Sequence, residues 1–145
     1  MENHYLFLLF LKEFYGKTKK ILLIDDDEFF LNIGIKILEE KYEIITTTSC
    51  IGALKKIVNG FIPDLILLDI IMPEIDGWKA YKILKWKSVL HDVPIIFLTS
   101  LNSSDDKQRA EIIGAKDFIT KPIEKNYMLK RIEEILMKKD QNNDL

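Results

Sequence analysis

A chain of 145 residues is long enough for one domain with a substantial hydrophobic core. Apolar residues make up 48% and charged residues 30% of the chain, which is typical of a globular protein and excludes a disordered one. The net charge is −2, with acidic and basic residues interspersed, so we expect no direct nucleic-acid binding by this chain.

The first 18 residues form an apolar extension whose run 5–11 contains no charged residue. This run is too short to span a bilayer, and Glu2, Asn3 and His4 stand where a signal peptide would have basic residues. We therefore expect a cytoplasmic protein without a membrane span. If helical, the run is apolar on all sides and needs cover from its own domain, a second copy or a partner. A start site assigned too far upstream, which would leave the run disordered, explains the sequence slightly less well. Contact with a membrane explains it least well, because basic residues are scarce.

Apolar runs then alternate five times with stretches of helical spacing. The expected strands are residues 21–24, 43–48, 64–69, 94–100 and 117–121. The expected helices are residues 28–42, 51–58, 77–87, 103–113 and 124–138. The first of these helices is expected to bury one stripe, which comprises Phe29, Ile33, Ile37 and Leu38. The alternation predicts an α/β fold with one parallel sheet flanked by five helices, plus an additional N-terminal helix.

The domain organisation follows from the same pattern. We expect an extension at residues 1–18, one domain at residues 19–138 and a polar tail at residues 139–145. The single cysteine, Cys50, excludes an intrachain disulfide and fits a reducing compartment. It is expected at the start of a helix rather than as a reactive thiol.

Polar side chains follow four of the five predicted strands. Asp25 and Asp26 follow the first strand, and the third, fourth and fifth strands offer Asp69, Thr99 and Lys121 in turn. Ligands of open parallel sheets bind at the carboxyl ends of the strands. With the strand order 2-1-3-4-5, these four strands are neighbours roughly 4.8 Å apart. Each residue alone fits a helix cap, a turn or the surface, but their combination at consecutive strand ends favours a site.

The residue types at these strand ends indicate phosphoryl transfer. Three crowded carboxylates resist ionisation unless a cation joins them, and magnesium prefers oxygen ligands. A hydroxyl from Thr99 and an ammonium from Lys121 would complete a pocket for an anion, where catalysis is mostly positioning and charge neutralisation. Asp69 lies centrally among these residues, so it is the expected nucleophile and would form an aspartyl phosphate.

The segments ILLIDDDE, LILLDIIMPEIDG, IIFLTS and GAKDFITKP resemble the receiver domain of bacterial two-component response regulators, over residues 19–138. The resemblance implies a flavodoxin-like fold and phosphorylation of Asp69 by a sensor histidine kinase or a phosphotransfer protein. It implies Mg²⁺ as the cofactor, held by Asp25, Asp26, Asp69 and the backbone carbonyl of Ile71. Such a domain is not a conventional enzyme, although it promotes its own magnesium-dependent phosphorylation and dephosphorylation.

The resemblance also implies a switch. Thr99 would bind a phosphoryl oxygen and move inward, and Phe118 would rotate into the space that Thr99 leaves. Lys121 would pair with Asp69 or its phosphate, and its peptide bond to Pro122 would be cis. The output surface would comprise residues 103–113, 117–121 and 124–138, and would contact a downstream protein target or a second copy.

Two apolar residues depart from common choices near the site. Ile71 and Leu101 each lie two residues beyond a site residue, at positions that vary within the family and influence the phosphate lifetime. We expect both side chains to hinder the hydrolytic water and to lengthen the phosphorylated state.

Two other functions fit parts of the sequence. A haloacid-dehalogenase-type phosphatase would carry D-x-D-x-[T/V], but Phe29 replaces the final Thr or Val after Asp25, and no second aspartate follows Asp69 at this spacing. A degenerate receiver that works without phosphorylation would lack an acidic or lysine position, and none is lost here. If the chain is complete it is a stand-alone receiver, and if it is an excised piece its output domain is not seen.

Overall fold

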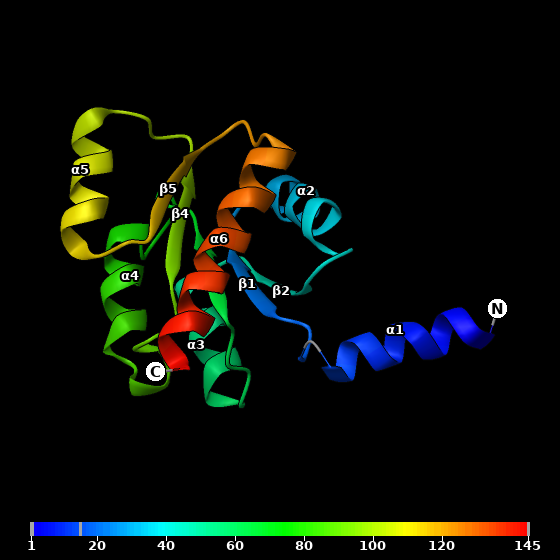
Figure 1. Ribbon diagram of the computed structural model, residues 1–145. Coiled ribbons are helices and arrows are strands. Elements are labelled where there is room, and N and C mark those ends of the chain that lie inside the picture. Colours follow the sequence, from blue (N-terminus) through cyan, green and yellow to red (C-terminus); the bar gives the residue numbers. More distant parts are fainter. Residues whose placement is uncertain (1, 15, 145) are drawn as a thin grey trace.

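Five short strands form one parallel sheet with the order β2-β1-β3-β4-β5 in the computed structural model, which describes residues 2–14 and 16–144 (Figure 1). The strands are β1 (Lys20–Ile24), β2 (Glu43–Thr47), β3 (Leu65–Leu68), β4 (Ile95–Thr99) and β5 (Asp117–Thr120). The predicted fold class and strand order are confirmed. The central strands β1 and β3 are buried on both faces, which explains their continuous apolar runs.

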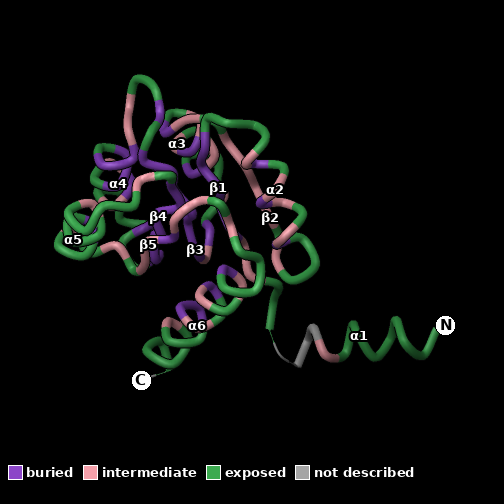
Figure 2. The backbone as a smooth tube through the Cα atoms, turned by 90° about the horizontal axis from the view of Figure 1, so that it is seen from above, coloured by how far each residue is buried: buried purple, intermediate pink, exposed green. Residues whose placement is uncertain are grey.

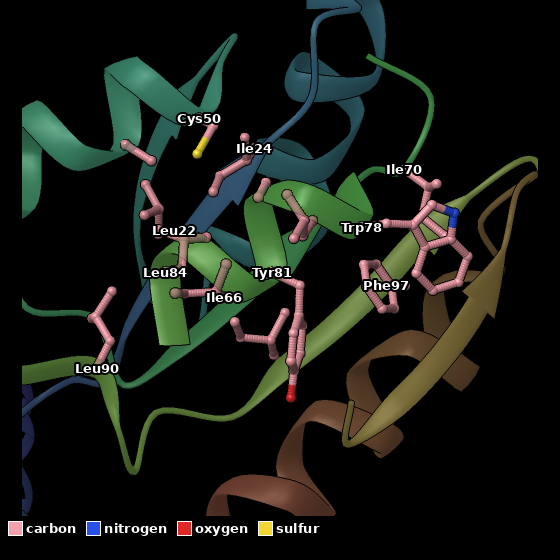
Figure 3. Packing of buried hydrophobic residues seen from close by; sticks show 14 of the residues in the cluster. Leu22, Ile24, Cys50, Ile66, Ile70, Trp78, Tyr81, Leu84, Leu90 and Phe97 are labelled. Carbon is pink, nitrogen blue, oxygen red and sulfur yellow. The ribbon is translucent and has the colours of Figure 1, made fainter. Parts of the chain in front are cut away.

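Helices cover both faces of the sheet, and the sheet separates two hydrophobic clusters. The helices are α1 (Glu2–Phe14), α2 (Glu28–Leu38), α3 (Cys50–Val58), α4 (Gly77–Trp86), the 3₁₀ helix η1 (Ser88–Leu90), α5 (Ser104–Ile113) and α6 (Lys125–Asn143). One cluster joins α3, α4 and α5 to strand residues such as Leu22, Ile66 and Phe97 (Figure 3). The other joins α2 and α6 to alternate strand residues such as Leu23 and Leu67, because successive strand side chains point to opposite faces.

The buried stripe of α2 differs from the predicted one. Leu31, Gly34 and Leu38 are buried, whereas Phe29 is 67% exposed. A Cβ atom at Gly34 would lie 2.4 Å from the Cδ2 atom of Leu23, so the glycine allows α2 to approach the sheet along this face. The prediction is confirmed for Leu38 and wrong for Phe29, and Ile33 and Ile37 are only half-buried, because the face toward the sheet runs through Leu31 and Gly34.

The closing helix is longer than predicted. α6 continues to Asn143, so most of the predicted polar tail is helical. Its buried residues are Met128, Ile132, Ile135 and Leu136, and Leu129 is half-buried. The last turns carry lysine and glutamine, which favour a helix even without burial.

The additional N-terminal helix is present as α1, but it projects away from the sheet and its covering helices (Figures 1 and 2). The side chains of residues 5–9 are 43–66% exposed. Cover by its own domain, one of the expectations for this run, is therefore not what the structure shows. Among the described residues, no helix is both long and apolar enough to cross a membrane.

Candidate functional site

The carboxyl ends of β1 and β3 bring two aspartates side by side. Ile24 pairs with Leu68 in the parallel register, and the backbone N–H of Asp69 donates to the carbonyl of Ile24 at 2.9 Å. Asp25 and Asp69 are therefore level with each other, with only 1% and 6% of their surface exposed. Exposed Asp26 completes the group, since one carboxylate oxygen from each residue lies within 4.8 Å of the others.

Lys121 reaches this carboxylate cluster from the end of β5. Its backbone N–H donates to the carbonyl of Thr99 at 2.8 Å, which continues the pairing of β5 with β4 beyond the last strand residue. Its Nζ atom lies 2.6 Å from Oδ2 of Asp25 and 3.4 Å from Oδ2 of Asp69. The peptide bond between Lys121 and Pro122 is cis, as the resemblance implied.

Burial makes the negative charge of Asp25 costly. Its pKa is raised, chiefly by removal from water and further by the nearby charge of Asp69. The hydrogen bonds from Lys121 and from the backbone N–H of Asp27 act in the opposite direction. Three carboxylates and one ammonium leave an excess of two negative charges at this place, which a divalent cation would balance.

The backbone around Asp69 is held closely by the start of α4. Oδ1 of Asp69 accepts a hydrogen bond from the N–H of Ile70 at 2.7 Å. The N–H of Gly77 donates to the carbonyl of Ile70 at 2.7 Å, and a Cβ atom at Gly77 would lie 2.3 Å from the carbonyl oxygen of Asp69. Asp76 begins α4 as its N-cap by accepting from the N–H of Lys79. The Asp-Gly pair therefore fixes both the helix start and the position of Asp69.

The two predicted switch residues, Thr99 and Phe118, differ in how far they are buried. Thr99 is fully buried, and its hydroxyl oxygen accepts a long hydrogen bond of 3.4 Å from the N–H of Leu101. Phe118 is half-buried, with its ring centroid 6.3 Å from that of Phe97. Ile71 lies in the loop just after Asp69 with its side chain 54% exposed. The roles of these residues in a switch or as ligands stay predictions.

Sequence reasoning missed one residue of the site. The Nζ atom of Lys121 lies 3.9 Å from the ring centroid of Phe30 on α2. An aromatic face attracts an ammonium, so Phe30 helps to hold the lysine over the carboxylates. The only signal in the sequence is that Phe30 lies in the first helical turn after the three aspartates. Helical spacing alone places Phe30 beside the core stripe and does not indicate a contact with Lys121.

Comparison with known proteins connects this geometry to a family. Residues 21–133 match the family model described as the response regulator receiver domain. The chain is 34% identical over 120 residues to the chemotaxis protein CheY of Halobacterium salinarum, a match that covers 82% of this chain and 98% of CheY. It is also 34% identical to the alkaline phosphatase synthesis transcriptional regulatory protein PhoP of Bacillus subtilis, but spans only 50% of that protein.

Solved structures give the same result. A CheY-like response regulator receiver domain from Methanospirillum hungatei has a TM-score of 0.78 and 28% identity, and the match covers 87% of this chain and 99% of that one. A putative response regulator from Chloroflexus aurantiacus has a TM-score of 0.77 and 28% identity, with coverage of 83% and 99%. These matches favour neither the phosphatase nor the degenerate receiver. The chain belongs to the response regulator receiver domain family.

Proposed function

We propose that Asp69 accepts a phosphoryl group from a phosphohistidine of a sensor histidine kinase or a phosphotransfer protein in the cytoplasm. The observation that carries this proposal is the placement of Asp69 between two further aspartates and the ammonium of Lys121, at the carboxyl ends of neighbouring strands. In the transfer, a carboxylate oxygen of Asp69 forms a bond to phosphorus while the phosphorus–nitrogen bond of the donor breaks.

The carboxylate cluster fits magnesium. Asp25, Asp26 and Asp69 would hold the ion, with the backbone carbonyl of Ile71 as a further oxygen ligand. When bound, Mg²⁺ neutralises the clustered charge and orients the oxygens of the transferred group. The excess of two negative charges at the cluster and the exclusively oxygen donor set both support this assignment.

Lys121 and Thr99 would stabilise the phosphoryl group. The ammonium of Lys121 already lies 3.4 Å from an oxygen of Asp69, so a positive charge stands where the phosphoryl oxygens would add negative charge. Within the described part of the chain, the hydroxyl of Thr99 makes only a long hydrogen bond of 3.4 Å, so little is lost when it turns toward a phosphoryl oxygen. Positioning of charge, rather than acid–base chemistry, is the contribution of these residues.

Movement of Thr99 would transmit the signal. Phe118 packs at the edge of the cluster that contains Phe97, and the proposed switch would move it from this half-buried position to a more buried one. The surface formed by α5, β5 and α6 would then bind a downstream protein target or a second copy of the chain. The chain would also promote its own magnesium-dependent phosphorylation and dephosphorylation.

The lifetime of the phosphorylated state is a separate part of the proposal. Ile71 is 54% exposed beside the site, and Leu101 is half-buried next to Thr99. Both apolar side chains would hinder the water that hydrolyses the acyl phosphate. We expect the double variant Ile71→Asn/Leu101→Glu to lose its phosphoryl group faster than the wild type, and faster loss from the wild type would contradict this role.

Intact-protein mass spectrometry after incubation with acetyl phosphate tests the proposal. We expect one added phosphoryl group in the presence of magnesium, and none with EDTA or in Asp69→Ala. Asp105→Ala, which changes an exposed aspartate in the first turn of α5, is the matched control and should still be phosphorylated. If neither acetyl phosphate nor beryllofluoride modifies or binds the wild type, the receiver works without phosphorylation and the proposal fails.

A further inference from the structure

A second candidate site lies at the end of the sheet opposite the carboxylate cluster. A cavity of about 560 Å³ is lined by residues that precede β4 and β5, such as Pro94 and Lys116, and by the C-terminal parts of α4 and α6. The carboxylate cluster, in contrast, lies at the carboxyl ends of the strands, because its residues come directly after β1 and β3. Small-molecule sites typically measure roughly 300–1,000 Å³, so this cavity is large enough for an organic ligand.

Positive charge dominates the lining of this cavity. The Lys and Arg residues in it are Lys85, Lys116, Arg131, Lys138 and Lys139, and among the described residues that line it Asp92 is the one with a carboxylate side chain. Arg131 is engaged, with Asp117 and Glu134 each at 2.6 Å. Lys116 and Lys138 are exposed and form no ion pair with any carboxylate of the described residues. Such a concentration of cations is unexpected in a chain whose net charge is −2.

Lys85 is half-buried, and the charges of two other lysines of the cavity act on it. Its ammonium donates to the carbonyl oxygens of Leu90 and His91, at 3.4 and 3.3 Å, and to that of Val93. Its pKa is lowered, chiefly by burial and then by the charge of Lys116, with a smaller contribution from Lys139 that Asp92 opposes. The charges of Lys116 and Lys139 therefore both act on Lys85, and an anion in the cavity that these residues line would relieve that repulsion.

Neutral hydrogen-bond donors complete the lining. The ring of Tyr81 packs against Phe97, with centroids 5.7 Å apart, while its hydroxyl points out of the apolar cluster (Figure 3). Burial raises the pKa of Tyr81, so the hydroxyl stays protonated and can donate. Asn142 and Asn143 contribute amide groups from the last turn of α6. Cations together with hydroxyl and amide donors are suited to phosphate oxygens.

We propose that this cavity binds a small anion with two or more phosphate groups, of the class of pyrophosphate or a nucleoside diphosphate. The lysines stand on two sides, with Lys85 and Lys116 on the side of α4 and β5 and Lys138 and Lys139 on α6. A ligand with a single charged group would leave the positive charge on one side of the cavity without a counter-charge. The proposal is independent of phosphoryl transfer to Asp69, because none of the lining residues belongs to the carboxylate cluster.

Isothermal titration calorimetry with pyrophosphate tests the proposal. The titrations contain EDTA and little salt, so that magnesium-dependent binding at Asp69 does not contribute. We expect saturable binding of one pyrophosphate to the wild type, weakened by added salt. The double variant Lys116→Gln/Lys138→Gln should bind roughly tenfold more weakly or worse, since it loses two charge-assisted contacts.

A matched double variant separates the cavity from general charge. Lys55→Gln/Lys125→Gln removes the same charge from exposed positions on α3 and α6 outside the cavity, and should bind like the wild type, as should Asp69→Asn. Tighter binding of ADP than of pyrophosphate would identify a nucleotide as the ligand, and equal or weaker binding would identify a free polyphosphate. Absence of saturable binding, or an equal loss in both double variants, would overturn the proposal. Binding of an acidic peptide without binding of pyrophosphate would also overturn it.

Discussion

Replacing Asp25 by asparagine should stabilise the metal-free protein. Asp25 is 1% exposed, and its environment raises its pKa even though Lys121 lies 2.6 Å away, so its ionised form lowers the free energy of unfolding at neutral pH. Asparagine keeps the shape and the oxygen that accepts from the N–H of Asp27, but has no charge. We therefore expect Asp25→Asn to raise the Tm of the metal-free protein at neutral pH. A change of about 1 kcal/mol shifts the Tm of a chain of this length by roughly 2–4 °C, so thermal unfolding can resolve the difference between the two proteins.

The size of this effect depends on pH. A carboxyl group whose pKa is raised by folding is neutral in both states below its ordinary value of 3.8, so it then costs nothing. As the pH rises through the folded-state pKa, the cost of ionising buried Asp25 develops fully. The advantage of Asp25→Asn in EDTA should therefore be present at pH 7 and vanish as the pH falls toward 4.

Magnesium should reverse the order of the two proteins. At a concentration one hundred times its Kd, a ligand of the folded state adds about 2.7 kcal/mol of stability, and Asp25→Asn lacks part of the ligand set. The assay is thermal unfolding by circular dichroism in EDTA and in magnesium. Asp26→Asn is the matched control: Asp26 is exposed, so its replacement should leave the Tm in EDTA nearly unchanged while also weakening the response to magnesium. A lower Tm of Asp25→Asn in EDTA at pH 7 would refute the reasoning.

Three further predictions concern the scaffold. Gly77→Ala should lower the free energy of unfolding by about 1–3 kcal/mol in urea, because the new Cβ would lie 2.3 Å from the carbonyl oxygen of Asp69 and 2.5 Å from Cα of Ile70. Deletion of residues 1–16 should change the free energy of unfolding by about 0.5 kcal/mol or less while reducing self-association in light scattering, since α1 exposes its apolar residues. Cys50 should resist a thiol reagent in the native state and react after unfolding, because it is 1% exposed and burial raises the pKa of its thiol.

Each of these has a direct counter-result. Gly60→Ala is the control for Gly77→Ala. Gly60 has open space around it but a φ of +97°, so an alanine there lowers the free energy of unfolding through backbone strain alone. Phosphorylation of Asp69 should therefore be unaffected in Gly60→Ala. A large loss of stability on deleting α1 would show that it packs on the domain after all. Rapid native-state modification of Cys50 would show that the start of α3 opens readily.

The sequence by itself predicted most of the fold and the composition of the candidate site. Continuous apolar runs such as those of β1 and β3 are expected only of strands covered on both faces, which predicts a parallel sheet between helices. The carboxyl ends of such strands meet at one edge, so Asp25, Asp69 and Lys121 could be predicted to lie together from their places after the strands alone.

Only the tertiary structure decided which contacts these residues make. The buried face of α2 depends on Gly34 and its close approach to Leu23, and a pattern of large apolar residues does not contain that information. Phe30 lies against Lys121 because α2 and the end of β5 meet in space, and local periodicity cannot predict a contact between segments so far apart in the chain.

The cavity lined by Lys85, Lys116 and Lys138 also could not be predicted from the sequence alone. Each lysine is an ordinary surface residue in the sequence, since it lies on a separate element and none forms a charge run with the others. They share one cavity only because α4, the approach to β5 and the end of α6 converge at one end of the sheet. The sequence determined the elements and the strand-end residues, because these depend on local pattern and on the geometry of parallel sheets. The packing of distant elements determined the raised pKa of Asp25, the support of Lys121 and the second site, because burial and electrostatic fields arise only after folding.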